Sequence, residues 1–375
     1  MPQTPPSPSD RDFATTCRIG TRGSDLALWQ AHTIQRLLGE LGTQTEIEII
    51  KTRGDRIDDV PLAQLEGKGF FTKELEDALL AGRVDLAVHS LKDLGTDMPD
   101  GLALAAMVGR EDAREMLLVR KEAVDEARLA RGEALPIKDG ARLGTSAARR
   151  QAQVKKLRPD VQIVDLRGNV PTRVNRLREE RYDAILLACA GLKRLELKLD
   201  DLFTMPLDPA VFVPAPAQGM LGLQCRDEDI WKRTIAQLDC TEAARAVRAE
   251  RTLLCRLEGG CQLPFGVNIT GSGSQWRLEA FLASEAVRRL GALRRLETAM
   301  AEGKIKGLAR GLAYRLIEAG ARDIEAFARA FAGHEALVAF VDIGGQQVRG
   351  VRIGARQHDR RHAGGVGGET RGGQL

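Results

Sequence analysis

A short apolar segment, a turn of small residues and an amphipathic segment follow one another repeatedly through the first half of the chain. The first example is Arg18-Ile-Gly-Thr21, then Arg22-Gly-Ser24, then a stretch from Asp25 to Leu38 with apolar residues at helical spacing. Ser24 is a good N-cap, and Asp25 complements the positive end of a helix. Strands that alternate with helices in this way favour a mostly parallel sheet with helices packed on it.

The same order recurs further along the chain. Arg142-Leu-Gly-Thr145 echoes Arg18-Ile-Gly-Thr21, and again small residues precede a predicted helix, from Ser146 to Leu157. The echo predicts two similarly built α/β lobes. Further strands are predicted at 46–51, 85–89, 161–166 and 184–189, and a further helix at 72–81.

The second half of the chain changes character. Val213-Pro-Ala-Pro-Ala-Gln218-Gly219 is typical of a hinge, and 220–225 predicts a strand that we expect to return to the first lobe. From Thr241 the sequence predicts a small α+β domain, with a long helix, a hairpin around Gly271-Ser-Gly-Ser274, a strand at 288–297 and helices from 304 to about 331. Residues 1–15, rich in Pro and Ser, and 344–375, rich in Gly and Arg, have the composition of disordered segments.

Composition excludes several classes of protein. The net charge of +4 over 375 residues is too small to argue for a nucleic-acid partner. No apolar run approaches the roughly 20 residues that cross a bilayer. The six cysteines form no C-x-x-C pair, so neither a zinc site nor a disulfide framework is indicated, and no phosphate-binding G-x-x-x-x-G-K-S/T motif occurs. A soluble protein of the cytoplasm is expected.

Six arginines fall just beyond predicted strand ends or in the first turn of predicted helices. In open α/β sheets, ligands bind in the crevice at the carboxyl ends of the strands, and helix N-termini there favour anions. A planar guanidinium also grips a carboxylate through two parallel hydrogen bonds. The pattern predicts a ligand with several carboxylates or phosphates, bound by Arg22, Arg149, Arg150, Arg167, Arg173 and Arg194.

Two other residues are candidates for chemistry. Asp93 is a carboxylate among these cations; it either caps its turn or pairs with Lys92, or it stabilises a cationic intermediate or moves a proton. Cys261 follows two glycines, which indicates an exposed turn; its thiol could be a redox group, an acyl-transfer nucleophile, a metal ligand or the attachment point of a covalent group. His89 ends an apolar strand and is expected to be a hydrogen-bonded core residue.

Seven short motifs, in order, resemble those of the porphobilinogen deaminase (hydroxymethylbilane synthase) family, from about Thr16 to about Gly333. The resemblance implies an α/β fold with two periplasmic-binding-protein-like lobes, the first of them discontinuous, and a small C-terminal α+β domain that carries a cofactor cysteine. The motifs are Arg18-Ile-Gly-Thr-Arg-Gly-Ser-Asp-Leu-Ala-Leu28, Thr52-Arg-Gly-Asp55, Gly67-Lys-Gly-Phe-Phe-Thr-Lys-Glu-Leu75, His89-Ser-Leu-Lys-Asp93, Leu166-Arg-Gly-Asn-Val170, Ala190-Gly-Leu-Lys-Arg-Leu195 and Leu257-Glu-Gly-Gly-Cys261.

The resemblance also implies the reaction. Members of this family are transferases that join four porphobilinogen units head to tail, lose ammonia at each step and release hydroxymethylbilane by hydrolysis, in tetrapyrrole (heme, chlorophyll, cobalamin) biosynthesis. The product is built on a dipyrromethane cofactor, which the enzyme makes from its own substrate and holds through a thioether to Cys261. The implied protein works as a cytoplasmic monomer with no metal and no nucleic-acid or membrane partner.

Matching positions carry the implied roles. Asp93 would be the catalytic carboxylate, which stabilises the cationic azafulvene left when ammonia departs. Substrate would be held by Arg22, Arg149, Arg167, Arg173 and Arg194, of which Arg194 serves elongation or exit, while Lys68 to Phe71 belong to a mobile lid. Besides Cys261, the residues that would hold the cofactor are Ser24, Lys92, Asp93, Ser146, Arg149, Arg150, Arg173 and Gln218.

The implied domains are 16–112 with 219–238 for the first lobe, 113–218 for the second lobe and 239–335 for the C-terminal domain. Four sites depart from the family's usual pattern. Ala147 and Ala148 replace Ser-Leu before the paired arginines, Pro171 stands where glycine is usual, Ala217 lies in Ala-Pro-Ala-Gln instead of Ala-Val-Gly-Gln, and Gln64 stands where lysine is frequent. Pro171 suits the first turn of a helix.

Two other functions stay open at this point. A noncatalytic bilobal protein that binds a small anion would not need Cys261 or a carboxylate among the arginines. A cysteine-nucleophile transferase would need a general base for the thiol, and no histidine lies near Cys261 in the sequence.

Overall fold

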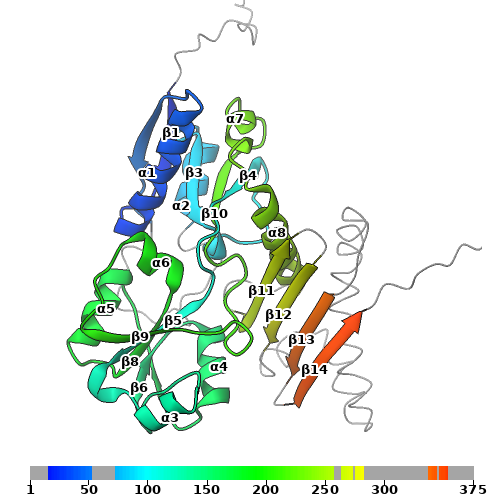
Figure 1. The fold of residues 1–375 in the computed structure, drawn as a ribbon. Helices are drawn as coiled ribbons and strands as arrows, with labels where there is room; N and C mark the ends of the chain where they lie inside the picture. Colours follow the sequence, from blue (N-terminus) through cyan, green and yellow to red (C-terminus); the bar gives the residue numbers. More distant parts are fainter. Residues whose placement is uncertain are drawn as a thin grey trace, which may run out of the picture.

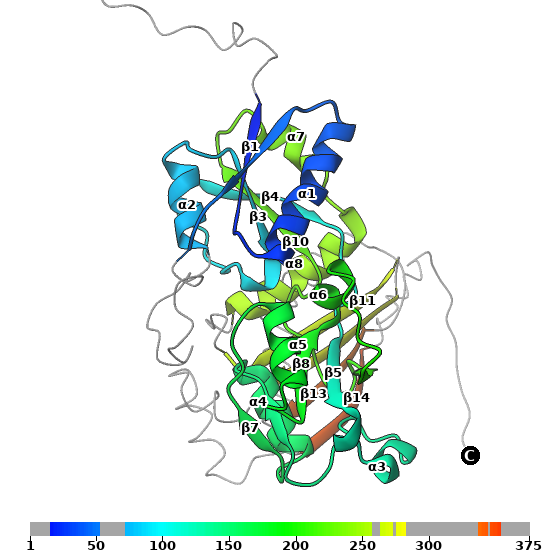
Figure 2. The same cartoon turned by 90° about the vertical axis from the view of Figure 1, so that its left-hand side faces the viewer.

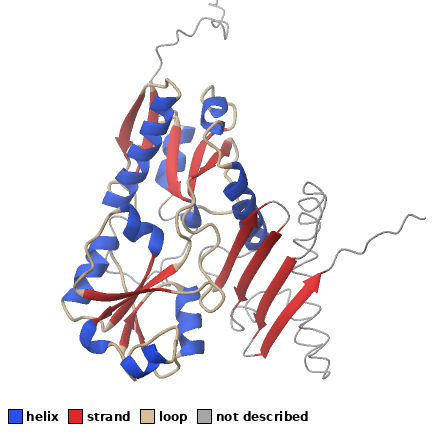
Figure 3. Ribbon diagram, viewed as in Figure 1, coloured by secondary structure: helices blue, strands red, loops and turns tan. Residues whose placement is uncertain are grey.

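The computed structural model describes residues 16–52, 72–256, 263–272, 275–282, 337–343 and 346–353. These residues form three sheets, two with five strands and one with four. Figure 1 shows the two five-stranded sheets in two lobes, one above the other, with the four-stranded sheet beside them. Helices pack along the sheets of both lobes (Figure 3). The expected α/β class, with two sheet-containing lobes and a C-terminal domain, is confirmed.

The first lobe contains the sheet with strand order β2-β1-β3-β10-β4. β1 is parallel to both β2 and β3, as the alternation of strands and helices predicts, whereas β10 is antiparallel to both β3 and β4. β10 comes from far along the chain, so this lobe is discontinuous. The elements are β1 (Cys17–Thr21), α1 (Asp25–Glu40), β2 (Thr45–Ile49), α2 (Lys73–Leu80), β3 (Leu86–Ser90), the short 3-10 helix η3 (Leu91–Asp93), β4 (Leu102–Val108), β10 (Leu221–Arg226) and α7 (Lys232–Ala236).

The second lobe repeats this arrangement with the strand order β7-β6-β8-β5-β9. β6 is parallel to both β7 and β8, and β5 is antiparallel to both β8 and β9. Each strand of one sheet therefore has a counterpart in the other. The elements are β5 (Glu115–Arg120), the short 3-10 helix η4 (Lys121–Ala123), α3 (Glu126–Ala130), β6 (Arg142–Gly144), α4 (Ala148–Leu157), β7 (Gln162–Val164), α5 (Val170–Arg178), β8 (Ala184–Ala188), α6 (Cys189–Arg194) and β9 (Leu202–Pro206).

The sequence echo between the lobes extends to an ion pair. In the first lobe, the backbone N–H and the Nη2 of Arg18 donate to Asp85 at 3.1 and 2.8 Å. In the second lobe, the same two groups of Arg142 donate to Asp183 at 2.8 and 3.2 Å. Because Arg18 lies in β1 and Arg142 lies in its counterpart β6, the echo reflects equivalent positions in two sheets of one design.

Helix α1 shows how apolar spacing sets the packing. Ser24 is its N-cap, and the Ser24 Oγ accepts a hydrogen bond from the Ala27 N–H, as predicted. The buried side chains of α1 recur at intervals of one, three and four residues; they are Ala27, Gln30, Ala31, Ile34 and Leu38. Of these, Ala31, Ile34 and Leu38 pack in the sheet core with Leu86 and Leu223. No helix in the described part of the chain is long and apolar enough to cross a membrane.

Two segments cross between the lobes, from β4 to β5 and from β9 to β10. They are joined to each other, because the Glu111 N–H donates to the Gly219 carbonyl at 3.0 Å. Gly219 has a φ of +87°, and a Cβ there would lie 2.2 Å from the Glu111 carbonyl oxygen. Ala217 also has a positive φ, +61°, a conformation that costs alanine roughly 1–2 kcal/mol. The predicted hinge is therefore a pair of tightly joined segments.

The C-terminal domain contains helix α8 (Thr241–Arg256) and a sheet with the order β11-β12-β13-β14. The predicted long helix and the predicted hairpin are confirmed, since β11 and β12 are antiparallel neighbours. This sheet lies beside the lobes in Figure 1 and behind the second lobe in Figure 2, so the two views agree that it packs on one side of the lobes. The strands are β11 (Phe265–Ser272), β12 (Gln275–Leu282), β13 (Leu337–Ile343) and β14 (Gln346–Ile353).

The prediction of a disordered tail from residue 344 is wrong for 346–353. β14 pairs antiparallel with β13, and β13 pairs parallel with β12. The high Gly and Arg content hid two signals of a hairpin: the pair Gly344-Gly345, typical of a two-residue turn, and three β-branched residues in β14. The predictions for 1–15, 288–297, 304–331 and the rest of the tail lie outside the described residues.

We predict that Gly219→Ala weakens the junction between the lobes. The new methyl group would meet the Glu111 carbonyl and alanine would have to keep a positive φ, so the free energy of unfolding should fall by roughly 2–4 kcal/mol. Gly140→Ala is the matched control, because Gly140 also has a positive φ, +68°, but nothing lies within 4 Å of its Cβ position. The control should lose only roughly 1–2 kcal/mol. Equal losses of the two variants in denaturant titrations would show that the approach to Glu111 has no energetic effect.

Candidate functional site

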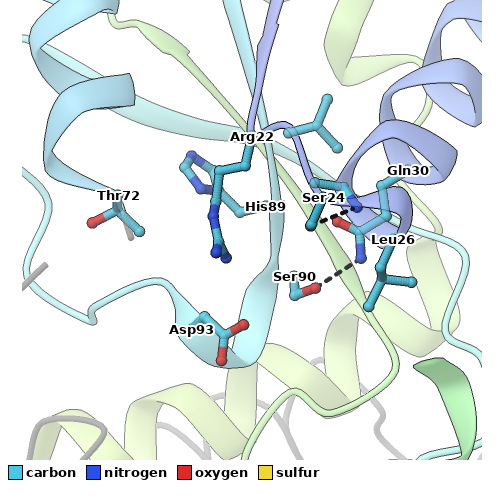
Figure 4. A pocket seen from close by; sticks show the side chains of 10 residues that line it. Arg22, Ser24, Leu26, Gln30, Thr72, His89, Ser90 and Asp93 are labelled. Carbon is cyan, nitrogen blue, oxygen red and sulfur yellow. Dashed lines mark hydrogen bonds between the residues drawn. The ribbon is translucent and has the colours of Figure 1, made fainter. Parts of the chain in front are cut away.

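The carboxyl ends of β1 and β3 open into a pocket in the first lobe. Arg22 and Ser24 follow β1, Ser90 ends β3 and Asp93 ends η3, and all four line the pocket. Figure 4 shows the Arg22 guanidinium extending toward Asp93, with Thr72 on one side of Arg22 and Ser24 and Ser90 on the other. The pocket therefore brings together three of the predicted site residues at the sheet edge where ligands bind in α/β folds.

Hydrogen bonds hold the wall of this pocket. Gln30 Nε2 donates to Ser90 Oγ at 2.7 Å, which ties α1 to the end of β3 (Figure 4). The Thr21 hydroxyl donates to the Ala27 carbonyl at 3.1 Å, which ties the end of β1 to the first turn of α1. The positions of Arg22 and Ser24 between these contacts are therefore set by buried structure.

His89 lines the pocket and is a hydrogen-bonded core residue, as predicted. Only 5% of its surface is exposed, and its Nε2 lies 2.9 Å from Gln224 Oε1. Burial lowers the pKa of His89 from 6.5 to about 4; Arg22 and Arg251 also lower it, whereas the Gln224 bond opposes the shift. His89 is therefore neutral at pH 7 and adds no positive charge to the site.

Lys92 and Gln218 connect the Asp93 turn to the hinge. Lys92 Nζ donates to Gln218 Oε1 at 3.2 Å, and Gln218 Nε2 donates to the Ala113 carbonyl at 2.8 Å. Burial lowers the pKa of Lys92, although the neighbouring Asp93 carboxylate opposes this shift. The turn that carries Asp93 is thus linked by side chains to the segment that enters the second lobe.

Arg149 and Arg150 share one buried carboxylate. Arg149 Nη2 donates to Glu115 Oε1 at 2.5 Å, and Arg150 Nη2 donates to Glu115 Oε2 at 2.7 Å. Glu115 is fully buried, and each arginine is 6% exposed. Burial alone would raise the pKa of Glu115, but Arg150, Arg149 and Lys92 hold it well below its usual range. Glu115 is therefore ionised and neutralises one of the two guanidinium charges.

The Nη1 groups of the two arginines bind different parts of the chain. Arg149 Nη1 donates to the Val213 carbonyl in the hinge at 2.7 Å, and Arg150 Nη1 donates to the Leu186 carbonyl in β8 at 2.8 Å. Arg150 Nε is buried and has no hydrogen-bond partner within the described residues. A buried donor without an acceptor is costly, so the cluster favours an added anionic acceptor.

Arg173 is influenced by the charges of both this cluster and the Asp93 turn. Its Nε donates to the Gly168 carbonyl at 2.7 Å. Burial and the neighbouring Arg150 charge together lower the pKa of Arg173 to about 10, while the Asp93 carboxylate opposes the shift. Because Arg150 and Asp93 both act on Arg173, the three predicted site residues occupy one electrostatic neighbourhood.

Ser146 joins two turns of the second lobe. Its Oγ donates to the Leu166 carbonyl at 3.0 Å and accepts from the Leu166 N–H at 2.9 Å. Arg167 follows directly, and its carbonyl accepts from Arg176 Nη1 at 2.8 Å. The turns after β6 and β7 are thereby held side by side, with Arg167 in the second of them.

Arg194 contacts the hinge. Its Nη2 donates to the Gly219 carbonyl at 2.6 Å and the Gly109 carbonyl at 3.2 Å, one in each crossing segment. Its Cζ lies 5.4 Å from the centroid of the Trp29 ring on α1 of the first lobe. These contacts fasten α6 to the other lobe, and the expected role of Arg194 in elongation or exit stays a prediction.

Several predicted residues lie outside the described part of the chain: Cys261, Lys68, Phe71 and Gln64. Of the departures from the family pattern, Pro171 lies in the first turn of α5, as predicted. Ala147 is the N-cap of α4 and makes no side-chain capping bond. In the described residues no group of three or more His, Cys, Asp or Glu side chains could hold a metal ion.

Sequence reasoning missed Glu115 and gave no role to Gln30 or Thr72. Glu115 directly follows the charged stretch Arg110-Glu-Asp-Ala-Arg114. The available signal was a single acid at the start of an apolar strand, Glu115-Met-Leu-Leu-Val, where a carboxylate needs a buried partner.

Comparison with known proteins agrees with the motifs. The family model described as porphobilinogen deaminase, dipyromethane cofactor binding domain, matches residues 17–233, and the one described as porphobilinogen deaminase, C-terminal domain, matches residues 244–304. The chain belongs to the porphobilinogen deaminase family. The first matched range covers both lobes, so it includes the Asp93 pocket and the Glu115 cluster.

Individual porphobilinogen deaminases are also similar to this chain over most of their length. The porphobilinogen deaminase of Trichlorobacter lovleyi is 48% identical over 270 residues, which cover 71% of this chain and 83% of the relative. That of Geobacter metallireducens is 48% identical over 273 residues, covering 71% and 81%. A solved ancestral cationic amino acid solute-binding protein has 15% identity and a TM-score of 0.37, covering 60% of this chain and 87% of that one. A TM-score this low carries no conclusion.

We predict that His89 makes this porphobilinogen deaminase family member lose stability in acid. The pKa of His89 is about 6.5 in the unfolded chain and about 4 in the fold, so the unfolded chain binds the extra proton between these pH values. The His89 contribution is therefore complete above pH 6.5 and is lost as the pH falls toward 4. Wild type should lose up to about 3 kcal/mol more of its unfolding free energy than His89→Asn over this range.

Denaturant titrations at pH 7, 5.5 and 4 measure this difference. His32→Asn is the control, because His32 lies on the exposed face of α1 and its removal should leave the wild-type pH dependence. A constant difference between wild type and His89→Asn at all three pH values would contradict the prediction.

Proposed function

We propose that this chain catalyses the porphobilinogen deaminase reaction, in which four porphobilinogen units are joined head to tail on a dipyrromethane cofactor, with loss of ammonia and final release of hydroxymethylbilane. The observation that carries the proposal is a carboxylate among cations: of the described residues that line the pocket, Asp93 alone is acidic. It lies toward the Arg22 guanidinium, and its charge raises the pKa of Arg173. Membership of the family supports the same reaction.

The charge of the site fits the cofactor and the substrate, whose pyrrole rings carry acetate and propionate groups. The Arg149–Arg150–Glu115 cluster keeps one net positive charge, and Arg150 Nε is a buried donor without a partner in the described residues. When bound, dipyrromethane supplies the pyrrole carbon to which the first porphobilinogen is joined. Its carboxylates are held by Arg149, Arg150 and Arg173, with Ser24, Lys92, Ser146 and Gln218 completing the site.

Asp93 stabilises positive charge on the substrate. Loss of ammonia from porphobilinogen leaves a cationic pyrrole, which would be repelled by the surrounding guanidiniums unless a carboxylate lies beside it. Asp93 is exposed at the end of η3, where a substrate held by Arg22 and Arg167 can reach it. The same carboxylate can take up the proton that leaves the pyrrole carbon on joining.

Chain connectivity supports attachment of the cofactor at Cys261. On one side, Arg251 of α8 donates to the Leu94 carbonyl at 2.9 Å and the Gly95 carbonyl at 2.6 Å, next to the Asp93 turn. On the other side, a Cβ at Gly266 would lie 3.1 Å from Arg149 Cδ. Cys261 stands five positions before Gly266, and five residues span at most about 18 Å. The attachment point therefore stands in the connection between α8 and β11, two elements that contact the Asp93 turn and Arg149.

The proposal also covers the remaining expectations from the sequence. Lys68 to Phe71 act as a lid, and Arg194 serves elongation or exit of the product. The protein is a cytoplasmic monomer that releases or hands on hydroxymethylbilane. Its domains are 16–112 with 219–238, 113–218, and a C-terminal domain of 239–335 that the strands at 337–343 and 346–353 extend.

We predict that Cys261→Ala removes both the cofactor and the activity. The intact mass of the purified wild-type protein should exceed that of its polypeptide by the mass of a dipyrromethane, and the variant should lack this increment. Cys255→Ala is the matched control, because Cys255 is an exposed free cysteine on α8 and its loss should change neither mass increment nor turnover. An unmodified, active wild-type protein would defeat the proposed function, and an increment that persists in Cys261→Ala would place the attachment elsewhere.

We predict that Asp93→Asn retains the fold and the mass increment but lowers kcat on the order of 10²–10⁴-fold, because the cationic pyrrole loses its counter-charge and the departing proton loses its acceptor. Asp100 is an exposed residue between η3 and β4, and the control Asp100→Asn should be as active as wild type. Product formation in stopped assays measures the effect. Wild-type kinetics in Asp93→Asn would remove Asp93 from this role.

A further inference from the structure

We propose that Glu115 is a positioning residue that holds Arg149 and Arg150 in the orientation in which they bind the carboxylates of the cofactor. The inference rests on the proposed function and names a residue of the same site. Glu115 opens β5, and both arginines lie in the first turn of α4. The inference assigns to Glu115 no contact with cofactor or substrate.

Helix geometry makes such a residue necessary. Consecutive residues of an α-helix project about 100° apart, so the side chains of Arg149 and Arg150 leave α4 in different directions. Their like charges also repel each other in a buried setting. The Glu115 carboxylate opposes both the divergence and the repulsion of the two side chains, because one oxygen binds Nη2 of Arg149 and the other binds Nη2 of Arg150.

Backbone acceptors complete the orientation. Arg149 Nη1 is fixed on the Val213 carbonyl and Arg150 Nη1 on the Leu186 carbonyl, so each guanidinium is held at two nitrogens. A planar group held at two of its three nitrogens cannot rotate. Glu115 is the part of this arrangement that both arginines share, and it leaves the Nε of Arg150 as a buried donor for an anion.

Glu115 also connects the arginines to the Asp93 turn. It directly follows the segment whose carbonyl at Ala113 accepts from Gln218, and Gln218 accepts from Lys92 next to Asp93. The Lys92 ammonium is near enough to Glu115 to help keep it ionised. The distance between the carboxylate-binding arginines and the catalytic carboxylate therefore depends on where Glu115 sits.

Glu115→Gln tests the inference, since it keeps the shape of the side chain and removes its charge. We expect the fraction of purified protein that carries the cofactor mass increment to fall, and the KM for porphobilinogen of the loaded fraction to rise on the order of 10²-fold, because displaced binding groups lose carboxylate contacts. Glu115→Asp keeps the charge but withdraws it by one methylene group, so its KM should lie between those of Glu115→Gln and wild type.

Asp183→Asn is the matched control. It removes a carboxylate from a similar arginine pair in the same lobe, at the opposite end of β8 from Glu115. Thermal unfolding shows how much stability each variant loses, and the control should keep the wild-type mass increment and KM. A role of Glu115 in stability alone predicts that Glu115→Gln and Asp183→Asn have the same cofactor content and KM.

The outcomes separate this inference from the proposed function. Wild-type protein without a mass increment would reject the proposed function itself. Wild-type protein with the increment, and Glu115→Gln with the same increment and KM as Asp183→Asn, would overturn only the role of Glu115. If Glu115→Gln yields no folded protein, Glu115→Asp decides: a raised KM supports positioning, and a wild-type KM overturns it.

Discussion

One buried carboxylate, Glu250, holds the three parts of the molecule together. It accepts from Arg110 Nη2, the Ala217 N–H and the Ile269 N–H, each at 2.7 Å. Arg110 lies in one crossing segment, Ala217 in the other, and Ile269 in the C-terminal sheet. Burial raises the pKa of Glu250, although Arg110 and the two N–H groups oppose the shift. Removing one partner of such a buried pair typically costs roughly 3–5 kcal/mol, so the relative placement of lobes and sheet depends strongly on this residue.

Arg251, the next residue of α8, connects this junction to the turn that carries Asp93. Arg251 donates to the backbone carbonyls of Leu91 and Leu94 on either side of Asp93, while Glu250 binds the hinge. Because Glu250 and Arg251 are adjacent residues of one helix, α8 links the hinge directly to the turn that carries Asp93.

The sequence predicted features that depend on local pattern and failed for features that depend on distant partners. Apolar period and turn chemistry located the strand ends, the Ser24 cap and the buried His89, because each follows from a few neighbouring residues. Glu115 and Glu250 could not be found this way, since Arg149 lies 34 residues from Glu115, and the partners of Glu250 lie 19, 33 and 140 residues from it along the chain. The β14 strand was missed for a different reason: composition outweighed a short β-branched pattern whose pairing depends on β13.

The partners of the arginines were likewise not predictable from the sequence. The number of arginines around the site therefore does not give the positive charge available to a ligand. A strand-end position predicts where a guanidinium lies but not which acceptor it uses. Arg194 donates to two hinge carbonyls and stacks on Trp29, and Arg149 donates to Glu115 and to the hinge. Several cations packed together repel one another unless some are bound internally. The charge left for a ligand is therefore set by the buried acids and carbonyls that bind these arginines, rather than by how many arginines surround the site.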